Sequence, residues 1–258
     1  MSSTRQALED YLAANPDDIA AHSAYADWLT ENDDPRGEYI RLELSLEDGD
    51  HTADQIQQIE KASDRLRKMH EAAWLGSFNE FVNPRRWQLR SSELPVDRYL
   101  IANFRRGWIH EVQIVNPTER FWELLLACPV SRLLRILKVI VPVEVYVHDT
   151  SSWLKSIAKF PVLNHLTINC DQFADASVDQ LLASGIVNQL QHLNLDQCGI
   201  TDDGTQAMAN DPAVRKLGSL ELELNYISPI GSEALQKIGV KVGEQMLPYQ
   251  HGPARYEV

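Results

Sequence analysis

The chain has 258 residues, of which 44% are hydrophobic, and it carries a formal net charge of -13 at pH 7. This apolar fraction can build a core and excludes wholesale disorder, and the length allows a small domain joined to a second architecture. The excess negative charge repels phosphate backbones and anionic lipids, so we expect neither a nucleic acid nor a membrane as partner.

Two further features of the sequence indicate a compartment. No stretch approaches the ~18 consecutive apolar residues of a membrane-spanning helix, and the polar first residues do not resemble a signal peptide. The three cysteines, Cys128, Cys170 and Cys198, have no C-x-x-C spacing and fit neither a disulfide framework nor a zinc knuckle. We therefore expect an acidic cytoplasmic protein.

The front of the chain has the pattern of four helices. Apolar residues recur at helical spacing over residues 4–14, 19–30, 38–46 and 52–74, and the turns between these stretches hold Asn, Asp, Pro and Gly. This pattern predicts an all-α domain over residues 1–80.

Within this region Tyr25, Asp27, Trp28, Arg36 and Glu38 form the densest polar and aromatic cluster. One interpretation is a site for a peptide or a small molecule. The other is that Asp27 pairs with Arg36 while Trp28 fills the core of the bundle. We favour the second interpretation, because charge pairs and buried tryptophans are ordinary parts of a scaffold.

Four strings of sequence in this part of the chain carry a family resemblance: YADWL, PRGEYIRL, HEAAWLGSF and FRRGWIHEVQI. On these strings the chain resembles bacterial proteins in which a repeat-companion domain precedes leucine-rich repeats. The resemblance implies a helical domain at residues 1–80, a connecting segment at 81–108 and repeats beyond it. It implies no activity, because none is established for that family.

Charge is distributed unevenly along this region. Residues 61–110 carry 10 Lys and Arg against 5 Asp and Glu, whereas residues 1–60 carry 3 against 15. The basic stretch could form a local anion site, or its arginines could dock against the acidic front of the same molecule. We favour docking within the molecule. The arginines concerned are Arg85, Arg86, Arg90, Arg98, Arg105 and Arg106.

A 27-residue period runs through the second half of the chain. Leu163, Leu190 and Leu217 each open the pattern L-x-x-L-x-L-x-x-N/C-x-L, and two further steps back reach Ile136 and Ile109. Five units in phase resemble leucine-rich repeats of the ribonuclease-inhibitor-like type. The expected fold class is α/β, with a leucine-rich-repeat solenoid at residues 109–243, an N-terminal all-α domain and a tail at 244–258.

Each unit has a physical reason to form a strand and a helix. Its alternating apolar half predicts a short parallel strand, and its second half predicts a turn and an amphipathic helix. One unit cannot bury its own apolar face, so the units stack and share a core. We expect Leu166, Leu193 and Leu220 to be buried on neighbouring strands, and Cys198 and Asn225 to bond backbone groups after them.

The third, fifth and seventh strand positions point away from the core, onto the concave face, and we expect them to have no structural role. They are therefore the candidate positions for binding a partner. The last three units offer a polar and partly acidic surface, and the first two units offer an apolar, slightly basic strip. The candidate partner-binding residues are Lys138, Ile140, His165, Thr167, Asn169, His192, Asn194, Asp196, Glu221 and Glu223.

The sequence contains no nucleotide-binding or catalytic motif of the G-x-S-x-G, Walker A, G-x-G-x-x-G or H-E-x-x-H type. We therefore expect no catalytic residues, no cofactor and no metal. The favoured function is a non-catalytic interaction module, an adaptor, scaffold or inhibitor that binds another protein on the concave face. Two alternatives stay open: a metal-dependent or enzymatic factor centred on His165 and His192, and a structural subunit of an assembly.

Overall fold

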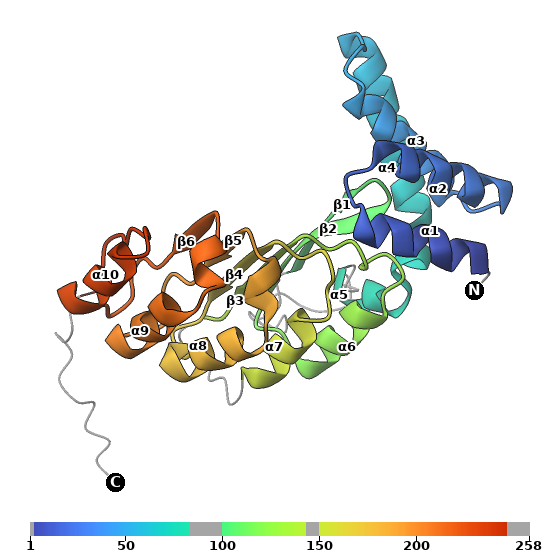
Figure 1. Cartoon of the computed structure of the whole chain (residues 1–258). Helices are drawn as coiled ribbons and strands as arrows, with labels where there is room; N and C mark the ends of the chain where they lie inside the picture. The colour runs from blue at the N-terminus through green and yellow to red at the C-terminus, as the bar shows by residue number, and fades with distance from the viewer. Residues whose placement is uncertain (1–2, 83–99, 143–149, 247–258) are drawn as a thin grey trace. The chain divides into compact units, whose positions relative to one another are not determined.

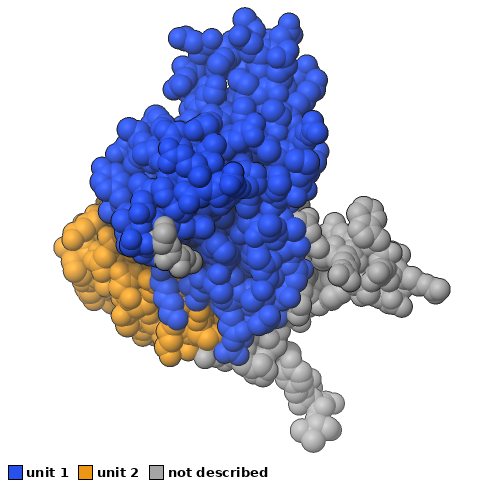
Figure 2. All heavy atoms as spheres, turned by 90° about the vertical axis from the view of Figure 1, so that its right-hand side faces the viewer, with its two compact units in different colours: residues 1–137, 159–163 blue, residues 138–158, 164–258 orange. Residues whose placement is uncertain are grey.

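The structure is a computed structural model that describes residues 3–82, 100–142 and 150–246. These residues form an α/β protein with a six-stranded, mostly parallel sheet in the order β1-β2-β3-β4-β5-β6. The chain divides into two compact units, unit 1 (residues 1–137 and 159–163) and unit 2 (residues 138–158 and 164–258) (Figure 2). The expectations for most of the tail and for four arginines lie outside the described residues. These arginines are Arg85, Arg86, Arg90 and Arg98.

Unit 1 begins with four helices where the apolar spacing predicts them. Asp18 caps the second helix by accepting a hydrogen bond from the backbone N of Ala21 at 3.0 Å. Thr52 and Gln55 form a capping box at the start of the fourth. The third helix starts two residues earlier than predicted, directly after Pro35. The helices are α1 (Ser3–Ala14), α2 (Ile19–Glu31), α3 (Arg36–Glu47) and α4 (Ala53–Leu75) (Figure 1).

An antiparallel hairpin follows in unit 1. Strand β1 (Leu100–Arg105) pairs with β2 (Trp108–Val115) through the two-residue turn Arg106–Gly107. Both turn residues have positive φ, 50° and 75°, as a type I′ turn requires. Residues 81–108 are expected to form a connecting segment without a strand, so the antiparallel pairing of β1 with β2 corrects that expectation. The elements around it are a 3-10 helix (Gly76–Phe78), α5 (Asn79–Val82) and α6 (Glu119–Ala127).

After β3 (Ile136–Ile140), the chain alternates helices and strands. In Figure 1, α8, α9 and α10 run side by side along one side of β4, β5 and β6. The elements are α7 (Ser151–Ile157), β4 (His165–Asn169), α8 (Ala174–Ala183), β5 (His192–Asn194), α9 (Asp202–Asn210), β6 (Ser219–Glu221) and α10 (Pro229–Gln236), with 3-10 helices at Ile186–Gln189 and Val214–Lys216.

The register of unit 2 follows the 27-residue step. Strands β4, β5 and β6 are parallel, and Leu166 pairs with Leu193, which pairs with Leu220. These three leucines are 1%, 1% and 8% exposed. The prediction that they are buried on neighbouring parallel strands is confirmed. Their side chains lie beneath the helices, because alternate strand residues point to opposite faces.

Asn225, directly after β6, is fully buried at 0% exposure. Its Oδ1 accepts hydrogen bonds from the backbone N of Cys198 at 2.9 Å and of Ile200 at 3.0 Å, and its Nδ2 donates to the carbonyl of Leu195 at 2.8 Å. The Cys198 Sγ donates to the carbonyl of Ile168 at 3.1 Å. The expectation that these two positions bond backbone groups is confirmed.

The N-cap residues of α9 and α10 are each hydrogen-bonded to the preceding helix. The Asp175 carboxylate accepts from the backbone N of Thr201 at 2.9 Å and from its hydroxyl at 2.6 Å. The Asp202 carboxylate accepts in the same way from Ser228, at 2.9 Å and 2.5 Å. Because Thr201 and Ser228 are the N-caps of α9 and α10, these bonds fix how neighbouring helices pack.

Gly231 in α10 lies beside the hydrogen bonds between Asp202 and Ser228, where there is no room for a side chain. A Cβ there would stand 2.7 Å from the Oγ1 of Thr205 and 2.9 Å from the Cγ2 of Ile227, and would overlap the Asp202 carboxylate. A Gly to Ala change in an exposed helix stabilises by roughly 1 kcal/mol, but this overlap reverses the sign. We expect Gly231→Ala to lower the free energy of unfolding by about 1–3 kcal/mol in urea titrations.

The matched control for this prediction is Ser232→Ala, the next residue of the same helix. It creates no overlap, so we expect its effect to stay within ~0.5 kcal/mol. Equal losses in the two variants, or a gain for Gly231→Ala, would contradict the close helix packing described above.

Candidate functional site

The candidate binding residues of the last three units share one face of the sheet in unit 2. On β4, His165, Thr167 and Asn169 are partly exposed, whereas the alternating Leu166 and Ile168 are buried. The strand register joins these side chains into rows across β4, β5 and β6. We call this set the ladder face: His165, Thr167, Asn169, His192, Asn194, Asp196, Ser219, Glu221 and Glu223.

The two histidines of the ladder face stack on each other. Their ring centroids are 4.1 Å apart and the rings are inclined by 24°. The Nδ1 of His192 lies 2.7 Å from the Ser219 hydroxyl, and the Nδ1 of His165 lies 2.7 Å from the Asn164 side-chain oxygen. Because the two rings are stacked, their nitrogens do not point toward a common position where a metal ion could be bound. Within the described ranges, no three His, Cys, Asp or Glu residues are placed to hold a metal ion.

Asn194 and Asp196 also support the local backbone. The side-chain oxygen of Asn194 accepts from the backbone N of Asp196 at 2.9 Å, and its Nδ2 donates to the Asp196 carboxylate at 2.8 Å. The same carboxylate accepts from the backbone N of Glu223 at 2.6 Å. The expectation that these face positions have no structural role is wrong for both residues, because a short polar side chain after a strand can bond nearby backbone groups.

Glu221 and Glu223 form the acidic end of the ladder face, and both are exposed. The Glu221 Oε2 accepts from the Nδ2 of Asn194 at 2.5 Å, which fixes this carboxylate on the sheet. No Lys or Arg among the described residues pairs with either glutamate. Lys138 and Ile140, also candidates, lie partly exposed on β3, next to β4 in the sheet order.

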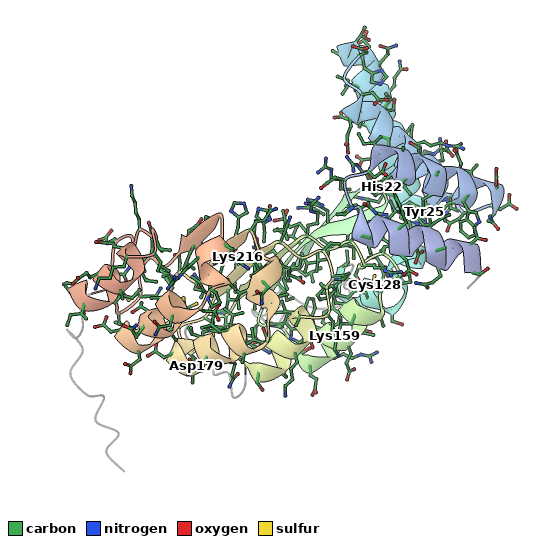
Figure 3. The ribbon with its side chains drawn as sticks, in the orientation of Figure 1. His22, Tyr25, Cys128, Lys159, Asp179 and Lys216 are labelled. Atoms are coloured by element: carbon green, nitrogen blue, oxygen red, sulfur yellow. The ribbon has the colours of Figure 1, made fainter. Side chains whose placement is uncertain are left out.

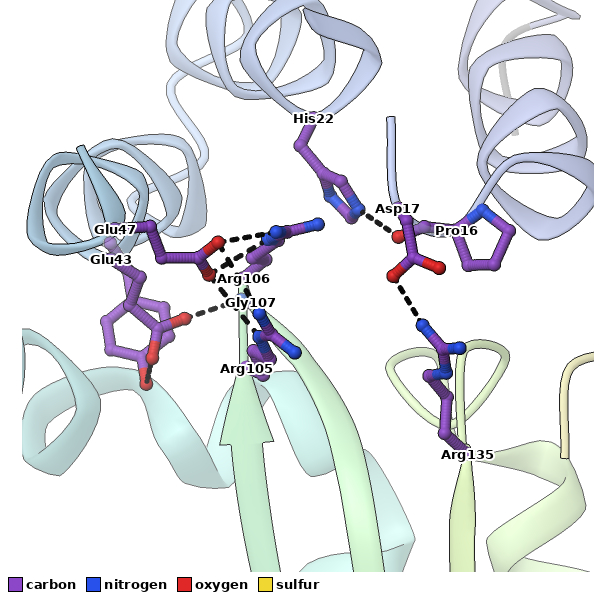
Figure 4. A network of polar contacts seen from close by, with 10 residues as sticks. Pro16, Asp17, His22, Glu43, Glu47, Arg105, Arg106, Gly107 and Arg135 are labelled. Carbon is purple, nitrogen blue, oxygen red and sulfur yellow. Dashed lines mark hydrogen bonds and ion pairs between the residues drawn. The ribbon is translucent and has the colours of Figure 1, made fainter. Parts of the chain in front are cut away.

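A small pocket in unit 1 was not among the candidate sites. It has a volume of about 20 Å³ and is lined by the turn after α1, by α2, by the β1–β2 hairpin and by the chain before β3. Because Arg105, Arg106 and Arg135 line it, we call it the arginine pocket (Figure 4). It also includes His22 and Trp108.

Carboxylates from the helical front partly neutralise these arginines. Glu47 of α3 accepts from the Nε of Arg106 at 3.0 Å and from the Nε of Arg105 at 3.3 Å, and Asp17 accepts from the Nη1 of Arg135 at 2.5 Å. The hydrogen bond from Arg106 is the main cause that lowers the pKa of Glu47 to about 2. Docking within the molecule, the favoured interpretation of the basic stretch, is confirmed for Arg105 and Arg106.

Burial and the neighbouring arginines lower the pKa values of the two histidines in the pocket. Burial lowers the pKa of His22, and the neighbouring Arg106 guanidinium lowers it further. Burial also lowers the pKa of His110, with additional contributions from Arg105 and Arg135. Both shifts favour the neutral imidazoles, and the positive charge of the pocket resides on its arginines.

Arg36 is buried behind this pocket, at 1% exposure. Its guanidinium donates to the hydroxyl of Tyr25 and lies 5.0 Å from the centre of the Trp108 ring. The predicted pair of Asp27 with Arg36 is wrong: Asp27 pairs with Arg41 at 2.7 Å. The reason is the helix geometry, because Arg36 begins α3 facing the core while Asp27 and Arg41 lie on exposed surfaces.

In the same cluster Trp28 is less buried than expected, and Tyr25 occupies the core. Tyr25 occupies the core at 0% exposure, between Trp108, with ring centroids 5.5 Å apart, and Trp28, at 6.4 Å. Trp28, predicted to fill the core, is only partly buried. Periodicity alone could not show which of the two rings is buried, because Trp108 packs against Tyr25 from a strand far along the chain.

Comparisons with known proteins do not identify a family. No protein-family model matches the chain, and no curated protein matches it. A crystal structure of a Bacteroides fragilis protein is 21% identical to the matched part of this chain, with a TM-score of 0.45. The match covers 54% of this chain and 42% of that one. No helix among the residues described is long and apolar enough to cross a membrane.

Proposed function

We propose that residues 109–243 form a leucine-rich-repeat solenoid and that the chain is a non-catalytic binding module for another protein. The support for the solenoid is the strand register, in which residues 27 positions apart pair on β4, β5 and β6. Such stacking aligns equivalent side chains in rows and creates an extended surface that suits protein recognition. As an adaptor, scaffold or inhibitor, the chain would bind its partner on the ladder face.

The observation that carries the proposal is the pair of exposed carboxylates at the end of the ladder face. Glu221 is held in place by Asn194, and neither Glu221 nor Glu223 pairs with a Lys or Arg among the described residues. Exposed carboxylates attract guanidinium and ammonium groups, and Asn194 holds one of the two on the sheet. The occupant we propose is therefore a protein segment that carries Arg or Lys, with its charges placed over Glu221 and Glu223.

The cysteines support a binding role over covalent catalysis. Burial raises the pKa of Cys128 to about 11 and is the main cause of raised pKa values for the thiols of Cys170 and Cys198. A nucleophilic cysteine requires the opposite shift and access to solvent. The stacked geometry of His165 and His192 likewise gives no support to a metal-dependent factor.

A peptide-display selection against the immobilised full chain tests the proposal. We expect the selected peptides to be enriched in Arg and Lys. The double change Glu221→Gln and Glu223→Gln should then weaken the affinity for a selected peptide at least tenfold, because charge-assisted bonds contribute about 1.5–3 kcal/mol each. The amides keep the size of the carboxylates, so the melting temperature should change little.

The control is Asp179→Asn with Glu233→Gln, which removes the same charge from the helical side of unit 2. Asp179 projects from α8 (Figure 3), and Glu233 lies on α10 in an exposed pair with Lys237. We expect the control to change the affinity less than twofold at 0.15 M salt, where charges beyond ~8 Å are screened. Selected peptides without basic residues, or equal losses in both double variants, would contradict the proposal.

A further inference from the structure

Three guanidinium groups line the arginine pocket, those of Arg105, Arg106 and Arg135, together with the carboxylate of Asp17. Glu47 pairs with Arg105 and Arg106, and Glu43 accepts from the backbone N of Gly107 beside them (Figure 4). Each guanidinium has five N–H donors, and these ion pairs use only some of them. An anion that enters the pocket therefore finds guanidinium N–H donors that these carboxylates do not occupy.

Two residues that line the pocket each carry a buried polar atom with no hydrogen-bond partner among the described residues. These atoms are the Nε1 of Trp108, whose side chain is 1% exposed, and the Nδ1 of His22, at 2% exposure. Leaving a buried polar atom without a hydrogen bond costs about 1–3 kcal/mol, so such atoms are rare in folded proteins. Two of them at one pocket indicate a bound group that supplies the missing hydrogen bonds. Both residues line the same pocket.

The chemistry of these two atoms specifies what the partner must offer. The indole Nε1 of Trp108 only donates, so it needs an acceptor oxygen. The Nε2 of His22 lies 3.0 Å from the carbonyl of Pro16, which can only accept. Nε2 therefore carries the proton of the neutral ring, and Nδ1 presents a lone pair that needs an O–H donor.

We propose that the arginine pocket binds a hydrogen-phosphate group, either free phosphate or the phosphoryl end of a phosphomonoester. Its negative charge meets the arginines, one oxygen accepts from Trp108, and its P–O–H donates to Nδ1 of His22. The pocket volume of about 20 Å³ is little more than the ~10–15 Å³ that one water requires, so a phosphoryl group would enter it only in part, from the open side. Arg105 is 48% exposed, so the pocket opens to solvent there and the remainder of a phosphomonoester can extend outward.

The test follows the indole N–H of Trp108 by nuclear magnetic resonance in the full chain, with Trp108→Phe to assign the signal. Sodium phosphate is added at pH 6 and constant ionic strength. We expect a saturable shift of this signal, with sulfate binding at least about tenfold more weakly because it has no O–H for His22. Phenyl phosphate is titrated in parallel, since about half of a phosphomonoester keeps its O–H at this pH.

Two variants complete the experiment. Arg105→Gln removes a half-exposed guanidinium and should weaken phosphate binding at least fivefold, and Arg135→Gln should have a similar effect. Arg120→Gln on α6 removes an equal charge outside the pocket and should change the binding less than twofold.

The results distinguish free phosphate from a phosphomonoester as the ligand, and some of them would overturn the proposal. Binding of phenyl phosphate as tight as that of free phosphate assigns the pocket to a phosphorylated ligand, whereas binding of free phosphate alone assigns it to the free ion. An indole signal that does not move means that water alone satisfies the pocket, which overturns the proposal. Equal responses to phosphate, sulfate and chloride, or an equal loss in Arg120→Gln, overturn it too.

Discussion

Leu193→Ala is expected to lower the free energy of unfolding by roughly 2–5 kcal/mol in urea or thermal denaturation. Leu193 is 1% exposed in the middle strand of β4, β5 and β6, between Leu166 and Leu220. Truncating it removes apolar contacts with both neighbours and leaves a cavity that the parallel register cannot easily close.

Ile230→Ala is the matched control for this core truncation. Ile230 is also an aliphatic residue of unit 2, but its side chain is 77% exposed. We expect the control to stay within ~0.5 kcal/mol of the unsubstituted chain. A loss for Leu193→Ala below ~1 kcal/mol would show that the strands are not packed in the described register.

Asn225→Ala is expected to lower the free energy of unfolding by roughly 2–4 kcal/mol. The substitution leaves the backbone N–H groups of Cys198 and Ile200 and the carbonyl of Leu195 without their side-chain partner in the interior. Each buried group that loses its partner costs about 1–3 kcal/mol, and water cannot replace a residue that is 0% exposed without opening the turn.

Asn188→Ala serves as the comparison for Asn225→Ala. The side chain of Asn188 makes one hydrogen bond among the described residues, an exposed one from its Nδ2 to the carbonyl of Gly185 at 3.1 Å. Its loss should cost below about 1 kcal/mol. If both asparagine variants unfold at the same denaturant concentration, Asn225 does not organise the turn after β6.

Some of the fold could be predicted because its signals are local or periodic. Helical spacing placed α1 to α4, and the 27-residue step placed Leu166, Leu193 and Leu220 on paired strands. The sequence FRRGW did not predict the β1–β2 hairpin, because Arg-Gly is a weaker signal for a type I′ turn than Asn-Gly or Asp-Gly. The leucine-rich-repeat assignment itself stays a prediction.

The sites were harder to predict than the core. Strand alternation placed the ladder face, but it could not show that Asn194 and Asp196 bond the local backbone. The arginine pocket brings together His22, Trp108 and Arg135, which lie far apart in the sequence. No periodic pattern links such residues, so the acidic front and the basic middle predicted an attraction between them without predicting a cavity.

The most direct test of the proposed function is to map where a selected basic peptide binds. Backbone amide signals of the full chain are compared by nuclear magnetic resonance before and after saturation with the peptide. If the peptide binds on the ladder face, the largest shifts are expected on residues 192–196 and 219–223. Largest shifts on α8, α9 and α10, or on the helices of unit 1, with the ladder face unchanged, would contradict the proposal.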